Sequence, residues 1–489
     1  MTINKLDLLS DSARYQLDIL RIFDMRKGQF TSVELLVELL GISKFKVNKY
    51  IAELEQALVA ATNAKVVRLS KGEIDIPDLS NEVIRQLQLY YLKQSDLFLL
   101  FHEMVQFGST PEKFSQKHFL SRSKAYLIKS ELEDILAPGG IQINEGTLVG
   151  DEAKVRREIF DIYYYFFNGL ESPFESSLRQ KTHEVLEVII HTLNLEMIMT
   201  RIAKLELFLS ITLLRLSKRS YVNTVEIEFE DVYAKEIRQQ LVLVQNKLQK
   251  ITVIPEEKQE NEQLWLLVFL LSEECLSLTT QQKTIRWNQN LTELTTLQVD
   301  YLFQTLKLVL STERKTEKIV ELQQVLELTN FKLAFANHSR LTFISEDQER
   351  FFAELYPQFH QVAKKFVELA KNSKIYDQGL LTNGSLYYDY IFAIISVIPQ
   401  KYLSDKVYVC VDFSRGSAYT KFIAENILAF QNLNIEVQKK VNNQTQLYVS
   451  DLLIDKLNCP QIIWKNPPSD HDWLLFGEMV IKVRNENES

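Results

Sequence analysis

Basic and amide side chains recur on one short segment in a pattern that suits contact with DNA. Residues 43–58 read SKFKVNKYIAELEQAL. Val47, Ile51 and Leu54 fall on one helix face, which places Lys49 on the opposite, exposed side with a cation and an amide on its flanks. Apolar residues would hold this helix on its domain while cations and amides bind phosphates and base edges. The candidate DNA contacts in this segment are Lys44, Lys46, Asn48 and Lys49.

A preceding helix and a turn would position this recognition helix. The first helix is expected to begin at Thr31 or Ser32. Its expected apolar face consists of Val33, Leu36, Leu39 and Leu40. A tight turn at Gly41–Ile42–Ser43 follows, with Ser43 as the N-cap of the second helix. The pattern predicts a helix-turn-helix unit.

A strand-turn-strand pattern follows the helix pair. Residues 66–76 read VVRLSKGEIDI, which predicts two short strands around Lys71 and Gly72. Such a hairpin is the wing of a winged helix. Arg68 and Lys71 are further candidate DNA contacts on this wing.

The same arrangement recurs 78 positions later. Residues 43–58 align with residues 121–136, so that Ser43 corresponds to Ser121 and Lys46 to Lys124. Thr110 and the following proline stand where the first helix of the pair should begin. Residues 141–148 supply a second wing. We therefore expect two winged helix-turn-helix units, at 1–78 and 79–150, with Arg122 and Lys124 as candidate DNA contacts in the second.

Composition favours a mainly helical protein of several domains. The chain has 489 residues, with only 13 Gly and 10 Pro, and a net charge of −8. This charge excludes a surface that binds nucleic acid everywhere, so a DNA site must be local. Three widely spaced cysteines, Cys275, Cys410 and Cys459, give no metal or disulfide pattern. With no signal peptide or spanning segment in the sequence, we expect a cytoplasmic protein without membrane, metal or cofactor.

Helical periodicity continues through the middle of the chain and changes near residue 404. Apolar residues at helical spacing predict one bundle at 151–283 and a second at 284–400. Residues 404–489 instead predict a small parallel α/β domain with strands at 406–412, 435–438 and 461–464. Helices are expected from Ser417, around Tyr448–Leu457 and through Phe476–Val483. The loop at 413–417 could hold an anion on its backbone N–H groups.

The order of these parts resembles the Mga family of Gram-positive transcription regulators. The resemblance rests on the two helix-turn-helix units and on the entry GDEAKVRR at 150–157 into two successive bundles. It implies that the bundles are phosphotransferase-system regulation domains, whose histidines accept phosphate from a phosphocarrier protein. The candidate phosphorylation sites are His183, His191, His338 and His360. It also implies an enzyme IIB-like domain at the C-terminus. Because Cys410 falls inside a strand and Asp412 holds the strand end, the phosphoryl-accepting cysteine of that fold is expected to be missing.

The leading functional hypothesis is a regulator that binds double-stranded promoter DNA. A homodimer, formed through the C-terminal or regulation domains, is expected because helix-turn-helix units usually meet DNA as symmetric pairs. One alternative is a helical scaffold that uses these units for protein partners. Another is an RNA-binding antiterminator-like regulator, although those proteins use a β-rich N-terminal domain. An enzyme is not expected, since no nucleophile, metal or Walker motif is present.

Overall fold

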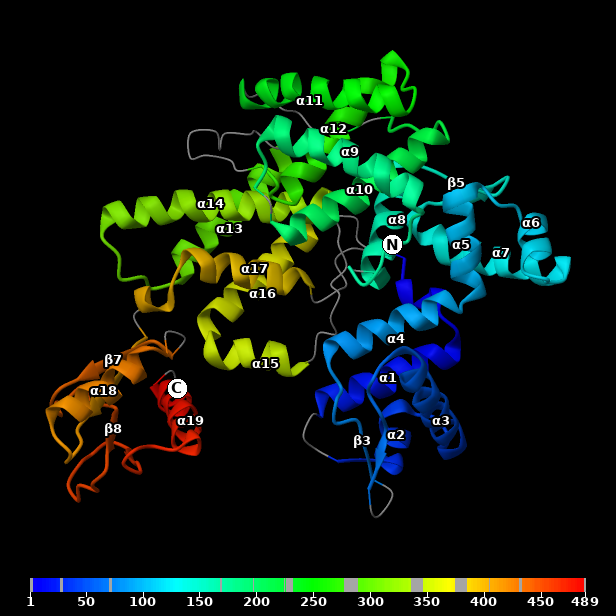
Figure 1. Cartoon of the computed structure of the whole chain (residues 1–489). Helices are drawn as coiled ribbons and strands as arrows, with labels where there is room; N and C mark the ends of the chain where they lie inside the picture. Colours follow the sequence, from blue (N-terminus) through cyan, green and yellow to red (C-terminus); the bar gives the residue numbers. More distant parts are fainter. Residues whose placement is uncertain are drawn as a thin grey trace. The chain divides into compact units, whose positions relative to one another are not determined.

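The computed structural model is mainly helical and carries one small parallel sheet near the C-terminus (Figure 1), which confirms the expected fold class. It describes residues 3–26, 30–69, 73–167, 169–196, 198–223, 225, 232–276, 289–335, 346–373, 385–403, 405–430 and 433–487. The chain forms two compact units. One comprises 1–288, 331–343 and 377–382, and the other comprises 289–330, 344–376 and 383–489.

The first helix-turn-helix unit forms as the sequence predicts, with small shifts. Its elements are η1 (Lys5–Leu8), α1 (Asp11–Met25), β1 (Thr31–Ser32), α2 (Val33–Leu40), α3 (Lys44–Ala61), β2 (Val67–Arg68) and β3 (Glu73–Asp75). The expected apolar stripe of α3 is confirmed, since Val47, Ile51 and Leu54 are buried. Gly41 adopts φ 64°, the left-handed conformation that ends α2.

The start of the first helix was predicted to within a residue, and one residue of its buried face was predicted wrongly. Thr31 does not begin α2 but pairs with Ile74 in the wing sheet, and Ser32 caps the helix. Leu39 is 54% exposed, although it was expected on the buried face. The helix is only two turns long, and Val33 and Leu36 complete its buried stripe.

The second unit repeats the first at the level of individual hydrogen bonds. Its elements are α4 (Asn81–Lys93), α5 (Asp96–Phe107), α6 (Pro111–Lys117), α7 (Arg122–Leu136), η2 (Ala137–Gly139), β4 (Gln142–Asn144) and β5 (Thr147–Val149). Ser43 accepts from the backbone N–H of Lys46 at 3.3 Å, and Ser121 accepts from that of Lys124 at 3.2 Å. Ser32 and Thr110, also 78 apart, cap α2 and α6 in the same way. The repeat is therefore structural as well as sequential.

Five long helices follow the second wing. They are α8 (Glu152–Phe167), α9 (Ser176–Leu193), α10 (Met199–Ser217), α11 (Val232–Ile251) and α12 (Glu256–Ser272). Helix α8 packs against α4, β5 and α10, so it joins the second helix-turn-helix unit to the first bundle.

The second compact unit contains a further set of helices. They are α13 (Gln289–Thr305), α14 (Thr312–Phe335), α15 (Glu346–Leu355), α16 (Pro357–Asn372), α17 (Ser385–Val397) and η4 (Gln400–Tyr402). The end of α14, from residue 331, belongs to the first compact unit. Val309, Val320 and Phe351 are exposed, although each continues the helical spacing of apolar residues by which this bundle was predicted. Val309 lies beyond the end of α13, so helical spacing does not apply to it.

The C-terminal domain is a parallel sheet of four strands with the order β7-β6-β8-β9. Its elements are β6 (Val407–Val411), α18 (Ser417–Leu428), β7 (Ile435–Gln438), β8 (Leu447–Ser450), β9 (Gln461–Ile463) and α19 (Asp470–Asn487). The helix expected around Tyr448–Leu457 is wrong, because Leu447–Ser450 is a strand that pairs with β6 through Cys410 and Tyr448. All four residues of β8 are buried, as in a strand covered on both faces.

No helix in the described part of the chain is both long enough and apolar enough to cross a bilayer.

Candidate nucleic-acid interface

The exposed face of α3 carries the cations that the sequence singled out. Lys49 is 55% exposed and lies 3.7 Å from Glu53, one turn along the same helix. Lys46 and Asn48 are exposed, and Lys46 makes no ion pair with any described residue. Lys44 pairs with Glu34 of α2 at 2.7 Å. The exposed placement expected for this helix face is confirmed, whereas its DNA contacts stay a prediction.

The ion pairs on this face are weak and exchangeable. Exposed pairs contribute between nothing and about 1 kcal/mol, because water and salt screen them. A DNA phosphate can therefore replace Glu34 or Glu53 at little cost. On the wing, Arg68 lies 3.3 Å from Glu55 of α3 and ties the strand to the helix. Lys71 lies outside the described residues.

The second recognition helix shares the framework of the first but has a different exposed face. Arg122 is exposed, and Lys124 lies 2.9 Å from Asp96 at the start of α5. Tyr126 and Leu127 stand at the positions that Asn48 and Lys49 occupy in α3, 50% and 68% exposed. Sequence reasoning passed over these two residues. The offset of 78, applied to every position rather than to the shared ones alone, would have found them.

A buried cluster of charged side chains fixes the second wing to the first bundle. The Oε1 atom of Glu152, in the first turn of α8, accepts hydrogen bonds from Nε of Arg156 and Nε of Arg215, both at 2.9 Å. Arg215, at the end of α10, also donates to Oε2 of Glu152 at 2.6 Å and to the backbone oxygen of Leu148 on β5 at 3.0 Å. One guanidinium thus joins the wing strand to two helices.

Glu262 of α12 completes this cluster. Its carboxylate accepts two hydrogen bonds from Arg156, at 2.6 and 2.9 Å, and one from the backbone N–H of Val222 at 2.9 Å. Two carboxylates and two guanidiniums, each at most 6% exposed, balance one another here. The GDEAKVRR entry supplies Glu152 and Arg156, but the sequence alone did not indicate Arg215 or Glu262 as their partners.

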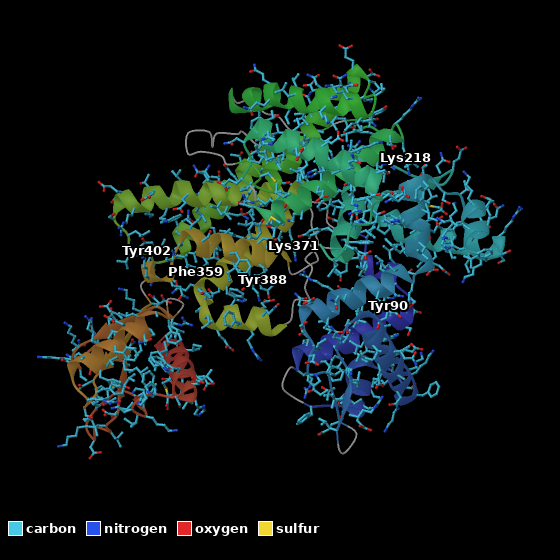
Figure 2. The ribbon with its side chains drawn as sticks, in the orientation of Figure 1. Tyr90, Lys218, Phe359, Lys371, Tyr388 and Tyr402 are labelled. Carbon is cyan, nitrogen blue, oxygen red and sulfur yellow. The ribbon has the colours of Figure 1, made fainter. Side chains whose placement is uncertain are left out.

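Lys218 makes a second link between the bundle and the helix-turn-helix region (Figure 2). Its Nζ donates to the backbone oxygens of Met104 and Val105 near the C-terminus of α5, at 2.9 and 2.5 Å. These carbonyls lie in the last turn of the helix, where a cation is favoured. Burial lowers the pKa of Lys218 to about 8.

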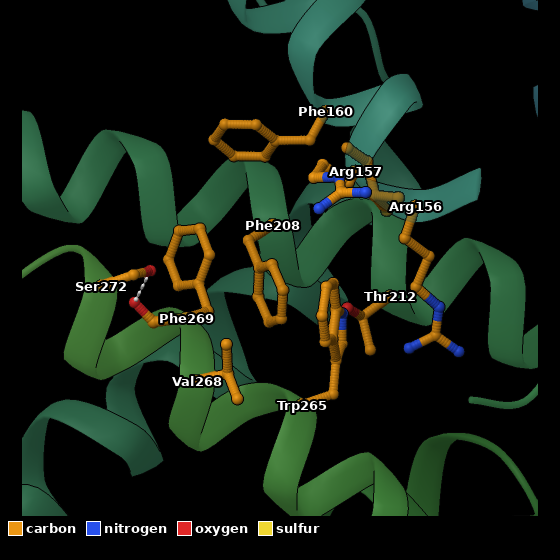
Figure 3. A pocket seen from close by; sticks show the side chains of 10 residues that line it. Arg156, Arg157, Phe160, Phe208, Thr212, Trp265, Val268, Phe269 and Ser272 are labelled. Atoms are coloured by element: carbon orange, nitrogen blue, oxygen red, sulfur yellow. Dashed lines mark hydrogen bonds between the residues drawn. The ribbon is translucent and has the colours of Figure 1, made fainter. Parts of the chain in front are cut away.

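The first bundle encloses a small cavity between aromatic side chains (Figure 3). The rings of Phe208 and Phe269 stack with their centroids 4.1 Å apart, and Thr212 and Trp265 line the same space. The cavity volume is about 30 Å³. This holds roughly two water molecules, so the cavity is too small for a sugar.

The candidate histidines that the structure describes lie on two different helices, α9 and α16. His183 on α9 is 66% exposed, with Nε2 3.3 Å from Glu187. His191 is exposed in the last turn of the same helix. In the second compact unit, Nδ1 of His360 lies in hydrogen-bond contact with Oη of Tyr387 at 2.7 Å, and burial lowers the pKa of His360. His338 lies outside the described residues.

The surroundings of these histidines differ in how well they would tolerate an added phosphate. A phosphate on His191 would stand at the negative end of the helix dipole, which disfavours it. A phosphate on His360 would have to form on Nε2, because Tyr387 occupies Nδ1. His183 is open to a phosphodonor, although the neighbouring Glu187 would repel the product.

The loop expected to bind an anion in the C-terminal domain is occupied by the protein itself. The carboxylate of Asp451 accepts hydrogen bonds from the backbone N–H and the hydroxyl of Ser414. These bonds lower the pKa of Asp451. Cys410 is buried in β6, and burial raises the pKa of its thiol to about 11. Neither feature suits a phosphoryl-accepting cysteine, which needs an accessible thiolate.

The described residues contain no group of three or more His, Cys, Asp or Glu side chains able to hold a metal ion.

Comparison with known proteins identifies the region around the second unit. Residues 80–166, which run from α4 into α8, match the family model of the Mga helix-turn-helix domain. No curated protein matches the chain. The matched segment contains α6, α7 and the second wing, and it ends in the helix that carries Glu152 and Arg156. The chain therefore contains a helix-turn-helix domain of the Mga type at residues 80–166.

Proposed function

We propose that the protein is a transcription regulator that binds double-stranded promoter DNA through residues 1–150. The observation that carries this proposal is the pair of matching helix-turn-helix units, one of which lies inside the region that matches the Mga helix-turn-helix domain. Each unit has cations on the exposed face of its second helix. Lys46 and Lys49 would contact DNA from α3, and Arg122 and Lys124 from α7. A homodimer would present these units to two half-sites of the promoter.

The regulatory part of the proposal concerns the helical bundles. Signals from the sugar phosphotransferase system would act on regulation domains at 151–283 and 284–400, through a phosphocarrier protein. Of the described candidate histidines we favour His183, because its side chain is 66% exposed and it does not lie in the last turn of α9 as His191 does. The cluster around Glu152 would carry a change in the first bundle to the second wing, because it joins α8, α10 and α12 to Leu148.

DNA binding is tested by fluorescence-anisotropy titration of a duplex across a salt series. The full-length protein is compared with the double variant Lys46→Ala/Lys49→Ala. The slope of log K against log salt is negative, and each lost phosphate contact makes it less steep by about 0.9. The slope of the variant should therefore be less negative by about 2 if both lysines contact phosphates. Lys421→Ala is the matched control, since this lysine of α18 is 77% exposed. Equal slopes for the double variant and the wild type would refute the assignment.

Phosphotransfer is tested separately on the full-length protein. Incubation with phosphoenolpyruvate, enzyme I and the phosphocarrier protein should add acid-labile phosphate, and His183→Ala should lose it if this residue is the acceptor. Labelling that is unchanged in His183→Ala would assign the acceptor elsewhere. A scaffold function predicts neither labelling nor salt-dependent binding to a duplex.

A further inference from the structure

We propose that α7 reads thymine, through apolar contacts of Leu127 and Tyr126 with 5-methyl groups in the major groove. This inference rests on the proposed DNA-binding function and adds to it which bases the second unit distinguishes. It concerns Tyr126 and Leu127, which stand where the first unit has Asn48 and Lys49.

The first support is the comparison between corresponding positions of the two recognition helices. The capping serines and most of the buried residues keep their character across the offset of 78, since Val47 and Leu54 correspond to Ala125 and Leu132. Ile51 is an exception, because it corresponds to the partly exposed Lys129. The exposed positions change from an amide and a cation in α3 to an aromatic and an aliphatic side chain in α7. At these two positions the same scaffold therefore presents polar groups in one unit and apolar groups in the other, although α3 also exposes Phe45 near its start, at 79%.

The second support is how these side chains are held. Leu127 is 68% exposed, so most of its apolar surface lies in water in the free protein. The hydroxyl of Tyr126 donates a hydrogen bond to Glu112 of α6, which fixes the ring against the helix pair. An ordered ring loses little conformational entropy when it binds.

Phe119, in the turn before α7, is a further exposed apolar residue of the second unit. It is 96% exposed and adopts φ 55°, in the left-handed region where its counterpart Gly41 lies at 64°. A bulky side chain is rare in this conformation, and strained residues gather at binding sites.

Charge favours DNA over a protein as the partner of this face. Arg122, at the start of α7, is exposed and makes no ion pair with a described residue. Lys124 is held only by an exposed pair with Asp96. Cations at the N-terminal end of a recognition helix suit phosphates, and apolar groups one turn further along suit the thymine methyl, which projects into the major groove.

The expected effect follows from the size of a methyl group. Burying one such group against an aliphatic side chain is worth about four-fold in affinity. Deoxyuridine differs from thymidine only by this methyl. Replacing a contacted thymine with deoxyuridine should therefore weaken binding about four-fold and leave the pairing edge unchanged.

The test uses the full-length protein and a duplex selected by it from a random pool. Duplexes of about 30 base pairs allow two half-sites one or two turns apart. The selected duplex is remade with deoxyuridine at each thymine in turn, and Kd is measured by anisotropy. The wild type should lose affinity at particular positions. Leu127→Ala should bind the thymine duplex about four-fold more weakly and should no longer distinguish it from the deoxyuridine duplex.

Lys124→Ala is the matched control, because it should weaken both duplexes equally. If no duplex is selected, the proposed DNA-binding function fails. If a duplex is selected but deoxyuridine has no effect at any position, the thymine inference alone is overturned. Unchanged DNA binding by Leu127→Ala, together with a smaller oligomer in sedimentation, would instead make the apolar face a protein interface and also overturn it.

Discussion

Glu262→Gln should loosen the first bundle because it leaves a buried guanidinium without its carboxylate. Glu262 is 5% exposed, and its two carboxylate oxygens accept hydrogen bonds from both terminal nitrogens of Arg156. After the change the cluster holds two guanidiniums and one carboxylate. Removing one partner of a buried pair costs about 3–5 kcal/mol, because the remaining charge stays desolvated.

Hydrogen exchange measured by mass spectrometry suits this prediction. A chain of several domains does not unfold in one step, so a global midpoint would mix transitions. Peptides from α8, α10 and α12 should exchange about 100-fold faster or more in Glu262→Gln, which corresponds to about 3 kcal/mol of local stability. Peptides from the C-terminal domain should not change. Glu257→Gln is the matched control, since this carboxylate is exposed on the same helix.

A double variant decides whether charge is the cause. Arg156→Met/Glu262→Met removes both charges and keeps Glu152 and Arg215 paired, so it should cost less than Glu262→Gln alone. Some cost will remain, because the carbonyl of Ser220 and the N–H of Val222 lose their partners. The reasoning would be refuted if exchange in Glu262→Gln matched the wild type, or if the double variant were the less stable of the two.

Two smaller predictions concern stability alone. Phe119→Gly should raise local stability by about 1 kcal/mol, because glycine adopts the left-handed conformation freely and the exposed ring loses no packing. Slower hydrogen exchange in the α6–α7 turn would confirm this prediction, and faster exchange would contradict it. Glu158 is buried, and burial, then the nearby Asp161, raises its pKa to about 7. Its folded-state pKa exceeds the unfolded value of about 4.3, so its contribution is full below that value and is lost as pH rises through 7. Glu158→Gln should therefore gain stability over the wild type as pH rises from about 4.3 to about 7, by about 4 kcal/mol at most. Hydrogen exchange of α8 peptides, compared at matched pH, measures this gain, and a gain that appears only at acidic pH would show the sign to be wrong.

Local signals in the sequence were enough to predict both helix-turn-helix units. The caps at Ser43 and Ser121 and the stripe at Val47, Ile51 and Leu54 depend on spacings within one or two turns. Such spacings are visible in the sequence because backbone geometry fixes them. The exposed placement of Lys46 and Lys49 followed from the same geometry.

Contacts between residues that lie far apart in the sequence could not be predicted. Glu262 lies 106 positions from Arg156, and Arg215 lies 63 from Glu152, so no local pattern joins them. The strand at Leu447–Ser450 was mistaken for a helix because four buried residues have no distinct periodicity. Asp451 could be placed on Ser414 only once this strand was known to lie beside β6.

The carboxylate of Asp451 has a consequence for any anion that approaches the loop at Ser414. A group attached to the same domain competes as if it were present at a concentration of the order of millimolar or more. It is never diluted, and its own hydrogen bonds keep it ionised at neutral pH. A phosphate-bearing metabolite present at micromolar concentration would therefore be outcompeted. Toward free phosphate, the loop behaves as a site already saturated by its own chain.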